Sequence, residues 1–265
     1  MYLQLKSISK VFENTTKESL SDISLEVQEG EFICIVGPSG CGKSTLLNLV
    51  SGLTTPSSGE IILDGNPVSK PGADRVMMFQ EAALYPWLNV MQNVMFGLEA
   101  KGLPKAEQKK IAEKYLRMVQ LWNYKDYPIH QISGGMKQRT ALARALAMDS
   151  KLLLMDEPFS ALDKQTINVL REELERIWEK TNKTILYVTH SVEEAIYFAD
   201  RVVVMSENPG EIREIIPITL ERPRHVENEA FMALRQQILA SVKAGVKKSM
   251  EEEFDPEAEE DKDEA

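Results

Sequence analysis

The sequence predicts an α/β fold with a mainly parallel core sheet flanked by helices. Two runs carry this prediction, Phe32–Val36 and residues 152–155, because an almost wholly apolar run is typical of a strand buried on both faces. A glycine-rich segment at residues 37–45 follows the first run and precedes a helical pattern. A buried strand, a glycine-rich loop and a helix in this order are typical of a phosphate-binding α/β domain.

The N-terminal part of the chain predicts a small antiparallel β subdomain. Apolar residues alternate along two segments, at Leu3, Leu5 and Ile8 and then at Ile23, Leu25 and Val27. Residues 44–50 are expected to form the helix that the glycine-rich loop opens. Residues 60–65 resemble a hairpin strand and its turn.

The remainder predicts an inserted helical subdomain and then further strands of the core sheet. Residues from about 88 to 148 look mainly helical, with Leu116, Val119 and Leu121 as one candidate apolar set. The later elements, in chain order, are strands at 152–155 and 184–189 around a helix at 166–180, strands at 201–205 and 212–218, and an amphipathic helix at about 226–246. Strand, helix and strand over 152–189 predict a right-handed crossover.

These elements divide the chain into a main domain and two appendages. The main domain spans 1–222 and contains the helical subdomain at about 81–149. A C-terminal helical appendage follows at 223–249, and an acidic tail occupies 250–265. Disorder is the expectation for the tail, because it is too acidic and too poor in apolar residues to pack.

Charge and composition exclude several classes of protein. The formal net charge is −10, but residues 251–264 hold ten acidic residues and one lysine, so the remainder is close to neutral and offers no basic surface for nucleic acid. No apolar run approaches the roughly 18 residues that cross a bilayer, and the N-terminus has no signal-peptide pattern. Cys34 and Cys41 lack metal-ligand spacing, which favours a reducing cytoplasm.

The glycine-rich segment fits the pattern G-x-x-x-x-G-K-[ST], which binds nucleoside triphosphates. Its backbone N–H groups and the helix N-terminus would cradle phosphates. Lys43 would reach the β- and γ-phosphates, and the Ser44 hydroxyl would bind Mg²⁺. Cys41 is interpreted as a small residue with no chemistry. The candidate residues for binding the phosphates are Gly37, Pro38, Ser39, Gly40, Cys41, Gly42, Lys43, Ser44 and Thr45.

Two carboxylates follow the apolar run at 152–155. We expect the strand that ends at Asp156 to lie beside the phosphate-loop strand, where this carboxylate can hold magnesium. Glu157 is expected to point elsewhere and to act as the base that orients and deprotonates the attacking water. The alternative interpretation is an exposed acidic turn ahead of Pro158.

Five elements in order give the chain a family resemblance. The phosphate loop, Ser133-Gly134-Gly135, Asp156-Glu157-Pro158, the segment 160–163 and His190 have the spacing of an ATP-binding cassette (ABC) ATPase, and the resemblance covers about residues 1–220. It implies that residues 1–222 form an ABC domain of the phosphate-loop NTPase fold that binds ATP and Mg²⁺. It also implies a head-to-tail homodimer, in which Ser133, Gly134 and Gly135 act in trans on the nucleotide of the partner.

The same resemblance assigns roles to four further residues. Gln80 matches the glutamine that senses Mg²⁺ and the attacking water, and His190 matches the histidine that contacts the γ-phosphate and steadies the glutamate. Phe12 matches the aromatic that stacks on adenine, with a core aromatic as the alternative. Asp163 belongs to the loop that crosses the dimer interface. The family's glutamine after the second glycine is Met136 here.

Residues outside these motifs are similar to importers of small, mostly anionic nutrients such as nitrate, sulfonate, taurine and bicarbonate. The similar segments are 79–81, 84–88, 93–94, 206–210 and 217–224. The resemblance implies a multi-spanning permease as partner, an extracytoplasmic substrate-binding protein as an indirect partner, and a peripheral location at the cytoplasmic face of the membrane. Pro86 and Trp87 fall where the family receives the permease, although core packing of Trp87 is an alternative.

Two other functions stay open on the sequence alone. One is a soluble ABC ATPase that is not coupled to transport, although no coiled-coil insertion, second cassette or basic surface is evident. The other is a phosphate-loop kinase or metabolic NTPase, against which Ser133-Gly134-Gly135 and His190 argue. The transported substrate cannot be inferred from this chain.

Overall fold

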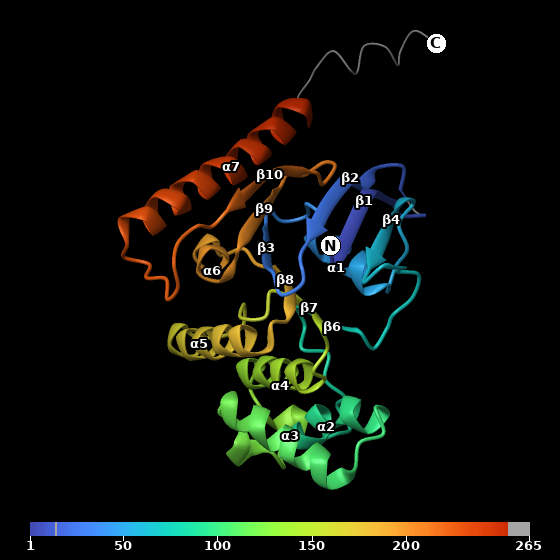
Figure 1. The fold of residues 1–265 in the computed structure, drawn as a ribbon, viewed down its shortest axis with the longest axis vertical. Coiled ribbons are helices and arrows are strands. Elements are labelled where there is room, and N and C mark those ends of the chain that lie inside the picture. Colours follow the sequence, from blue (N-terminus) through green and yellow to red (C-terminus); the bar gives the residue numbers. More distant parts are fainter. Residues whose placement is uncertain (14, 254–265) are drawn as a thin grey trace.

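The computed structural model describes residues 1–13 and 15–253, which form two β-sheets with helices around them (Figure 1). The larger sheet has the strand order β10-β9-β3-β8-β7-β6. Every neighbouring pair in it is parallel except β9 and β10. The predicted mainly parallel core sheet is therefore confirmed. Its strands are β3 (Phe32–Val36), β6 (Arg75–Met78), β7 (Leu152–Asp156), β8 (Thr184–Val188), β9 (Arg201–Met205) and β10 (Ile212–Pro217).

The smaller sheet is antiparallel and has the order β2-β1-β4-β5. This confirms the antiparallel β subdomain and the hairpin predicted near residue 65. Helix α1 (Lys43–Ser51) packs between the two sheets, because Leu46 and Leu47 share one core with strand residues of both. The strands are β1 (Leu3–Val11), β2 (Glu18–Val27), β4 (Ser58–Leu63) and β5 (Asn66–Pro67).

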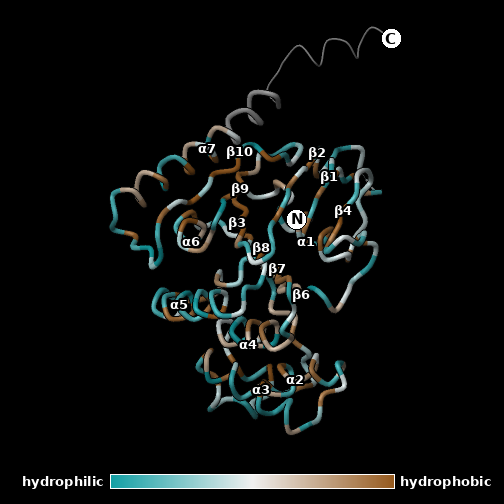
Figure 2. The backbone as a smooth tube through the Cα atoms, in the orientation of Figure 1, coloured by the Kyte–Doolittle hydropathy of each residue, from teal (hydrophilic) through white to brown (hydrophobic). Residues whose placement is uncertain are grey.

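Strand β3 separates two hydrophobic cores because successive side chains of a strand point to opposite faces. Ile33 and Ile35 join the core under α1 and the antiparallel sheet. Phe32, Cys34 and Val36 join the core that the other helices cover. Figure 2 shows the central strands as hydrophobic and the helices as alternating between hydrophobic and hydrophilic residues. The double-sided burial explains the continuous apolar run that the sequence carries here.

The remaining helices cover the second core. Helices α2, α3 and α4 pack on one another and extend away from the antiparallel sheet (Figure 1). Leu116, Val119 and Leu121 are fully buried among them, as the sequence predicted. The helices are α2 (Val90–Ala100), α3 (Lys105–Met118), α4 (Gly134–Ala147), α5 (Lys164–Thr181), α6 (Val192–Phe198) and α7 (Glu229–Glu253), with 3-10 turns at Trp122–Tyr124 and Ile129–Gln131.

Two expectations about the arrangement need revision. The strand that ends at Asp156 was predicted beside the phosphate-loop strand, and this is wrong, because β8 lies between β7 and β3. A strand order cannot be derived from which strands are apolar, since all three are buried on both faces. Helix α7 continues to Glu253, so residues 250–253 are helical, and the predicted disorder of the tail beyond them lies outside the described residues.

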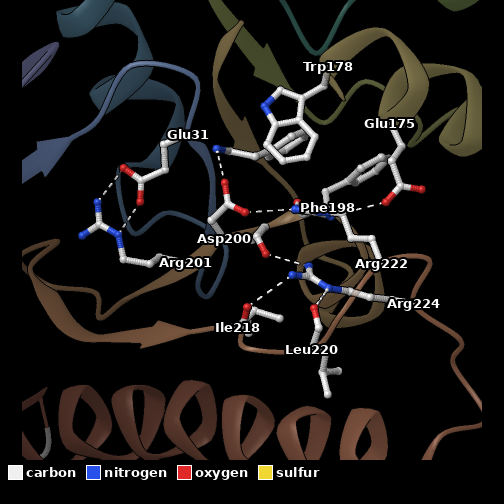
Figure 3. A network of polar contacts seen from close by, with 12 residues as sticks. Glu31, Glu175, Trp178, Phe198, Asp200, Arg201, Ile218, Leu220, Arg222 and Arg224 are labelled. Atoms are coloured by element: carbon white, nitrogen blue, oxygen red, sulfur yellow. Dashed lines mark hydrogen bonds and ion pairs between the residues drawn. The ribbon is translucent and has the colours of Figure 1, made fainter. Parts of the chain in front are cut away.

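A polar network joins the segment before α7 to the end of α6 and to Asp200, the residue before β9 (Figure 3). Arg222 donates to Asp200 Oδ1 at 3.1 Å and to the Phe198 carbonyl at 2.7 Å, and its guanidinium lies 4.4 Å from the ring of Trp178. Arg224 is buried and donates to backbone carbonyls at the end of α6 and beyond β10. Two arginines therefore bind carbonyl groups that the helix leaves without intrahelical partners.

Candidate functional site

The glycine-rich loop connects β3 to α1 and folds around the ammonium group of its lysine. Lys43 Nζ donates to the carbonyls of Gly37 at 2.9 Å and Pro38 at 2.7 Å. The loop comprises Gly37, Pro38, Ser39, Gly40, Cys41 and Gly42, followed by Lys43, Ser44 and Thr45 in the first turn of the helix. A cation inside a loop at a helix N-terminus makes an anion-binding site of the kind that phosphates use.

Gly42 shows why the loop needs glycine. It caps α1 with φ 88°, a conformation that side-chain-bearing residues rarely adopt. A Cβ atom there would lie 2.5 Å from Leu20 Cδ2 and 3.0 Å from the Ser19 carbonyl. Cys41 is fully buried beside it, and burial raises the pKa of its thiol although Lys43 opposes the shift. The neutral thiol agrees with the interpretation that Cys41 has no chemistry.

Asp156 ends β7 as a buried carboxylate that is only partly satisfied. It is 4% exposed, and Ser44 donates a hydrogen bond to it. Its Oδ1 has no hydrogen-bond partner among the described residues. Burial raises the pKa of this carboxyl, with the Ser44 hydrogen bond and Lys43 opposing the shift. A buried, unpartnered carboxylate oxygen beside a serine hydroxyl is a donor set that suits a hard divalent cation such as Mg²⁺.

Asp156 and Ser44 supply few ligands by themselves. Within residues 1–13 and 15–253, no group of three or more His, Cys, Asp or Glu side chains could hold a metal ion. Mg²⁺ keeps several waters and is bound through one or two protein groups together with substrate phosphates. The residues present therefore fit a cation that enters with a nucleotide and do not fit a dedicated metal cage.

The backbone of Glu157 adopts φ 47°, which is uncommon for a residue with a side chain. Three hydrogen bonds hold this uncommon conformation. The Glu157 N–H donates to the Val188 carbonyl at 3.0 Å, and the Glu157 carbonyl accepts from the N–H of Ser160 at 3.2 Å and from its hydroxyl at 3.0 Å. Uncommon backbone angles persist where surrounding contacts determine them, and such places are often functional. The exposed acidic turn that the sequence left open is excluded, since the Glu157 carboxylate is 12% exposed.

Both carboxylate oxygens of Glu157 have partners from other strands. His190 Nε2 lies 2.5 Å from Oε1, and Gln80 Nε2 donates to Oε2 at 3.2 Å. Gln80 follows β6, Glu157 follows β7 and His190 follows β8. Because the three strands are parallel neighbours, their carboxyl ends bring the three side chains together at one edge of the sheet.

A cavity of about 700 Å³ borders Glu157 and His190 on the side of α5 and α6. Its lining also includes Arg171 on α5, Thr189 in the loop after β8, and Glu194 and Tyr197 on α6. Arg224 and the exposed His225 also line this cavity. The cavity therefore joins the candidate base to a buried polar group that the sequence analysis did not identify.

Ser133 and the two glycines after it begin α4. The Ser133 hydroxyl caps the helix by accepting from the Met136 N–H at 3.3 Å. A Cβ atom on Gly135 would lie 3.2 Å from Leu162, whereas one on Gly134 would have open space around it. These contacts join the Ser133–Gly135 turn to the segment at 161–162 and do not involve the phosphate loop of the same chain.

The remaining candidates lie at the surface. Phe12 is 44% exposed, with Lys10 Nζ 5.2 Å from the centre of its ring, so the core alternative is wrong. Asp163 is exposed and caps α5 by accepting from Thr166, whose backbone N–H lowers the pKa of this carboxyl. Trp87 is 75% exposed, which excludes core packing for it as well.

Two buried polar residues near these sites, Glu194 and Asn93, had no structural role predicted from the sequence. Glu194 is 7% exposed and accepts from the hydroxyls of Tyr187 and Thr189. Asn93 is fully buried and bonds the backbone of Tyr85 and Asn89, which shapes the loop that exposes Trp87. A glutamate in the first turn of a helix is a common surface residue, so no sequence signal marks Glu194 as buried. The capping pattern Asn89–Gln92 was available as a signal for the second loop.

The fold and the loop define an α/β protein that binds nucleoside triphosphates. Residues 20–160 match the family model described as ABC transporter. An uncharacterized ABC transporter ATP-binding protein of Methanocaldococcus jannaschii is 50% identical over 250 residues, with 94% of each chain covered. The chain therefore belongs to the ABC transporter family, as an ATP-binding ATPase of the kind that is coupled to transport.

Other relatives carry more specific names. A nitrate import ATP-binding protein of Synechocystis sp. is 47% identical and covers 83% of this chain and 84% of its own length. A taurine import ATP-binding protein of Pseudomonas putida is 42% identical, with 91% and 95% covered. A solved dimeric ATP-binding cassette in a post-hydrolysis state, bound to ADP and Pi, matches with a TM-score of 0.76 and 30% identity over 83% of this chain and 100% of that one.

None of the helices in the described part of the chain is long and apolar enough to cross a membrane.

Proposed function

We propose that this chain is the ATP-hydrolysing subunit of a membrane importer for a small anionic nutrient, such as nitrate, a sulfonate, taurine or bicarbonate. One observation carries the catalytic part of the proposal, the contact of Glu157 with both His190 and Gln80 beside the phosphate loop. The similarity to nitrate and taurine import proteins supports the importer part.

Each residue has a task in this mechanism. The loop at 37–45 binds the phosphates of ATP, Lys43 neutralises the β- and γ-phosphates, and Phe12 offers a ring face to the adenine. Glu157 orients the attacking water and takes its proton, while His190 steadies that carboxylate and contacts the γ-phosphate. Mg²⁺ would be held by Ser44 and Asp156, with Gln80 nearby, and would neutralise charge on the phosphates.

The proposed site is completed by a second copy of the chain. Ser133, Gly134 and Gly135 would approach the γ-phosphate in the partner, and Asp163 would lie in the loop that crosses the interface. The Ser133 hydroxyl accepts from the Met136 N–H of its own helix, and a Cβ atom on Gly134 would have open space around it, which leaves the start of α4 available for this role. Binding of ATP would close the dimer, and hydrolysis would remove the γ-phosphate that holds it closed.

Transport requires a separate multi-spanning permease, which this chain would bind peripherally at the cytoplasmic face of the membrane, and an extracytoplasmic substrate-binding protein that delivers the nutrient. The exposed Trp87 stacks near Tyr85, with ring centres 5.5 Å apart, and marks the surface where the permease would dock. A permease recovered with the tagged protein from solubilised membranes supports the importer. Recovery only from the soluble fraction favours an ABC ATPase that is not coupled to transport.

Two variants test the catalytic assignment. Glu157→Gln keeps the shape of the side chain but cannot accept a proton, so ATP binding should persist while hydrolysis falls by about 10²- to 10⁴-fold. Lys43→Ala should instead weaken ATP binding itself. Wild-type hydrolysis by Glu157→Gln, or unchanged ATP affinity in Lys43→Ala, would remove the corresponding assignment.

A further inference from the structure

A buried carboxylate lies directly behind the loop that carries His190. Glu194, in the first turn of α6, has a side chain that is 10% exposed. Its Oε2 accepts from the Tyr187 hydroxyl at 2.8 Å and from the Thr189 hydroxyl at 2.8 Å. Arg171 Nη2 lies 3.7 Å from the other oxygen. A carboxylate removed from water in this way stays charged only where such donors compensate for the lost hydration.

The Thr189 hydroxyl links this carboxylate to the backbone on both sides of His190. It donates to Glu194 and accepts from the Ser191 N–H at 3.0 Å. The Thr189 N–H in turn donates to the Ile35 carbonyl of β3 at 3.2 Å. The residues before and after His190 are therefore fixed to the strand that leads into the phosphate loop and to α6.

Helix α6 also forms a hydrogen bond with the residue after His190. The Ser191 hydroxyl accepts from the Glu194 N–H at 3.2 Å and caps the helix. Burial raises the pKa of Tyr187 well above its ordinary value, and the neighbouring Glu194 adds to the shift, so the Tyr187 hydroxyl remains a donor. Glu194 thus accepts hydrogen bonds from two hydroxyl groups, one on β8 and one in the loop after it.

The position of the His190 imidazole depends on the backbone around it, because the side chain is half exposed. The imidazole is 47% exposed and contacts Glu157 Oε1 at 2.5 Å. A half-exposed side chain takes its direction from its backbone, and a misplacement of about 1 Å at a reacting group can lower a rate by about 10²-fold.

We propose that Glu194 and Thr189 are positioning residues for ATP hydrolysis, which hold the backbone at His190 so that the imidazole meets Glu157. The proposal rests on the proposed role of His190. Arg171 supports the arrangement through the second oxygen of Glu194. Neither positioning residue is among the proposed nucleotide-binding residues, so their loss should affect turnover and leave ATP affinity unchanged.

The test compares Thr189→Val with Thr189→Ser, at saturating protein and saturating Mg·ATP. Valine removes the hydroxyl at nearly constant volume, and serine keeps it. We expect kcat to fall about tenfold or more in Thr189→Val and to stay within about twofold of the wild type in Thr189→Ser. The dissociation constant for ATP, measured by fluorescence titration, should stay within about twofold in both.

Thr184→Val is the matched control. Thr184 is a buried threonine at the other end of β8, and its hydroxyl accepts from the Gly30 N–H at 3.0 Å. The same substitution there removes a buried hydrogen bond far from His190. We expect it to lower the melting temperature and to leave kcat of the folded protein unchanged. Glu194→Gln is the second test variant, because its amide NH2 group must replace either the oxygen that accepts from both hydroxyls or the oxygen that faces Arg171.

Three outcomes would overturn the proposal. The first is a kcat in Thr189→Val and Glu194→Gln equal to that of Thr184→Val, which would make the network only a structural support. The second is a further loss of kcat when Thr189→Val is added to His190→Ala, because residues that act through His190 should add nothing without it. The third is wild-type kcat in His190→Ala. That result would overturn the proposed catalytic role of His190, and with it the proposal that Glu194 and Thr189 act by positioning His190.

Discussion

At the scale of single residues, the burial of the Asp156 carboxylate lowers the stability of the folded protein. Its carboxylate is buried, and one oxygen has no partner among the described residues. Burial raises its folded-state pKa, so the ionised form destabilises the folded protein at neutral pH. This cost is present above the folded-state pKa and disappears as the pH falls below the ordinary carboxyl range. A cation that binds the free oxygen would offset it.

We therefore expect Asp156→Asn to raise the free energy of unfolding of the nucleotide-free protein by about 1 kcal/mol at pH 7, because the buried charge is gone. The difference from the wild type should shrink as the pH is lowered and vanish well below the ordinary carboxyl pKa of about 3.9, where Asp156 is protonated in both states. Urea unfolding at several pH values measures it. The variant should also lose the part of ATP-induced stabilisation that requires Mg²⁺.

Asp200→Asn is the control for this prediction. Asp200 accepts from the Phe32 N–H at 2.9 Å and from Arg222 at 3.1 Å, so its charge is compensated. The same substitution should therefore lower stability and leave the Mg²⁺ dependence unchanged. A loss of stability in Asp156→Asn as large as that in Asp200→Asn would contradict the interpretation of Asp156.

At the scale of elements, the end of α6 is held by an arginine instead of a terminal glycine. Arg224 donates to the carbonyls of Ile196 at 2.7 Å and Ala199 at 2.6 Å, and to Ile218 at 3.3 Å. The planar guanidinium serves several carbonyls at once, which a single ammonium cannot do with the same geometry. Glu194 lies in the first turn of α6. The hydrogen bonds of Arg224 at the end of α6 therefore also hold the helix that positions the His190 loop.

Arg224→Lys should accordingly lower the free energy of unfolding by about 2 kcal/mol, since buried carbonyls lose their donors. Hydrolysis per folded molecule should change less than in Thr189→Val, because the α6 N-terminal cap stays in place. Arg213→Lys, at an exposed position on β10, is the control and should be neutral. A neutral Arg224→Lys would show that the network in Figure 3 contributes little to stability.

The sequence predicted helices and strands better than it predicted which strands lie side by side. The buried strands, the phosphate loop and the antiparallel subdomain follow from apolar runs, glycine spacing and alternation, which are local signals. The insertion of β8 between β3 and β7 does not, because three equally apolar strands have no local signal for their order. Glu194 and Arg224 were missed for a related reason. A charged residue gives no sign in the sequence that it is buried by partners up to 28 residues away.

At the scale of the whole molecule, two exposed surfaces are the ones that we propose bind partners. One is the start of α4 with its two glycines, and the other is the surface around Trp87. A cavity of about 500 Å³ between α2 and α3 lies near this tryptophan, and Leu88, Met95 and Phe96 are among its lining residues. A large exposed aromatic beside a partly apolar hollow is typical of a protein interface.

We expect Trp87→Ala to leave stability within about 0.5 kcal/mol of the wild type and to leave ATP binding unchanged, because the side chain is largely in solvent. The amount of protein that sediments with membranes containing the permease should fall severalfold. Met232→Ala, on α7 and 42% exposed, should show no such loss. Equal membrane recovery of the Trp87 and Met232 variants would place the docking surface elsewhere.

The most direct measurement is the mass of Glu157→Gln in solution, determined by sedimentation equilibrium with Mg·ATP and without nucleotide. Hydrolysis that needs a second copy predicts a monomer without nucleotide and a stable dimer with Mg·ATP. The dimer should be lost when Ser133→Arg is added, because a bulky cation would occupy the start of α4 opposite the phosphates. A protein that binds Mg·ATP fully and yet stays monomeric at all concentrations would contradict the central claim.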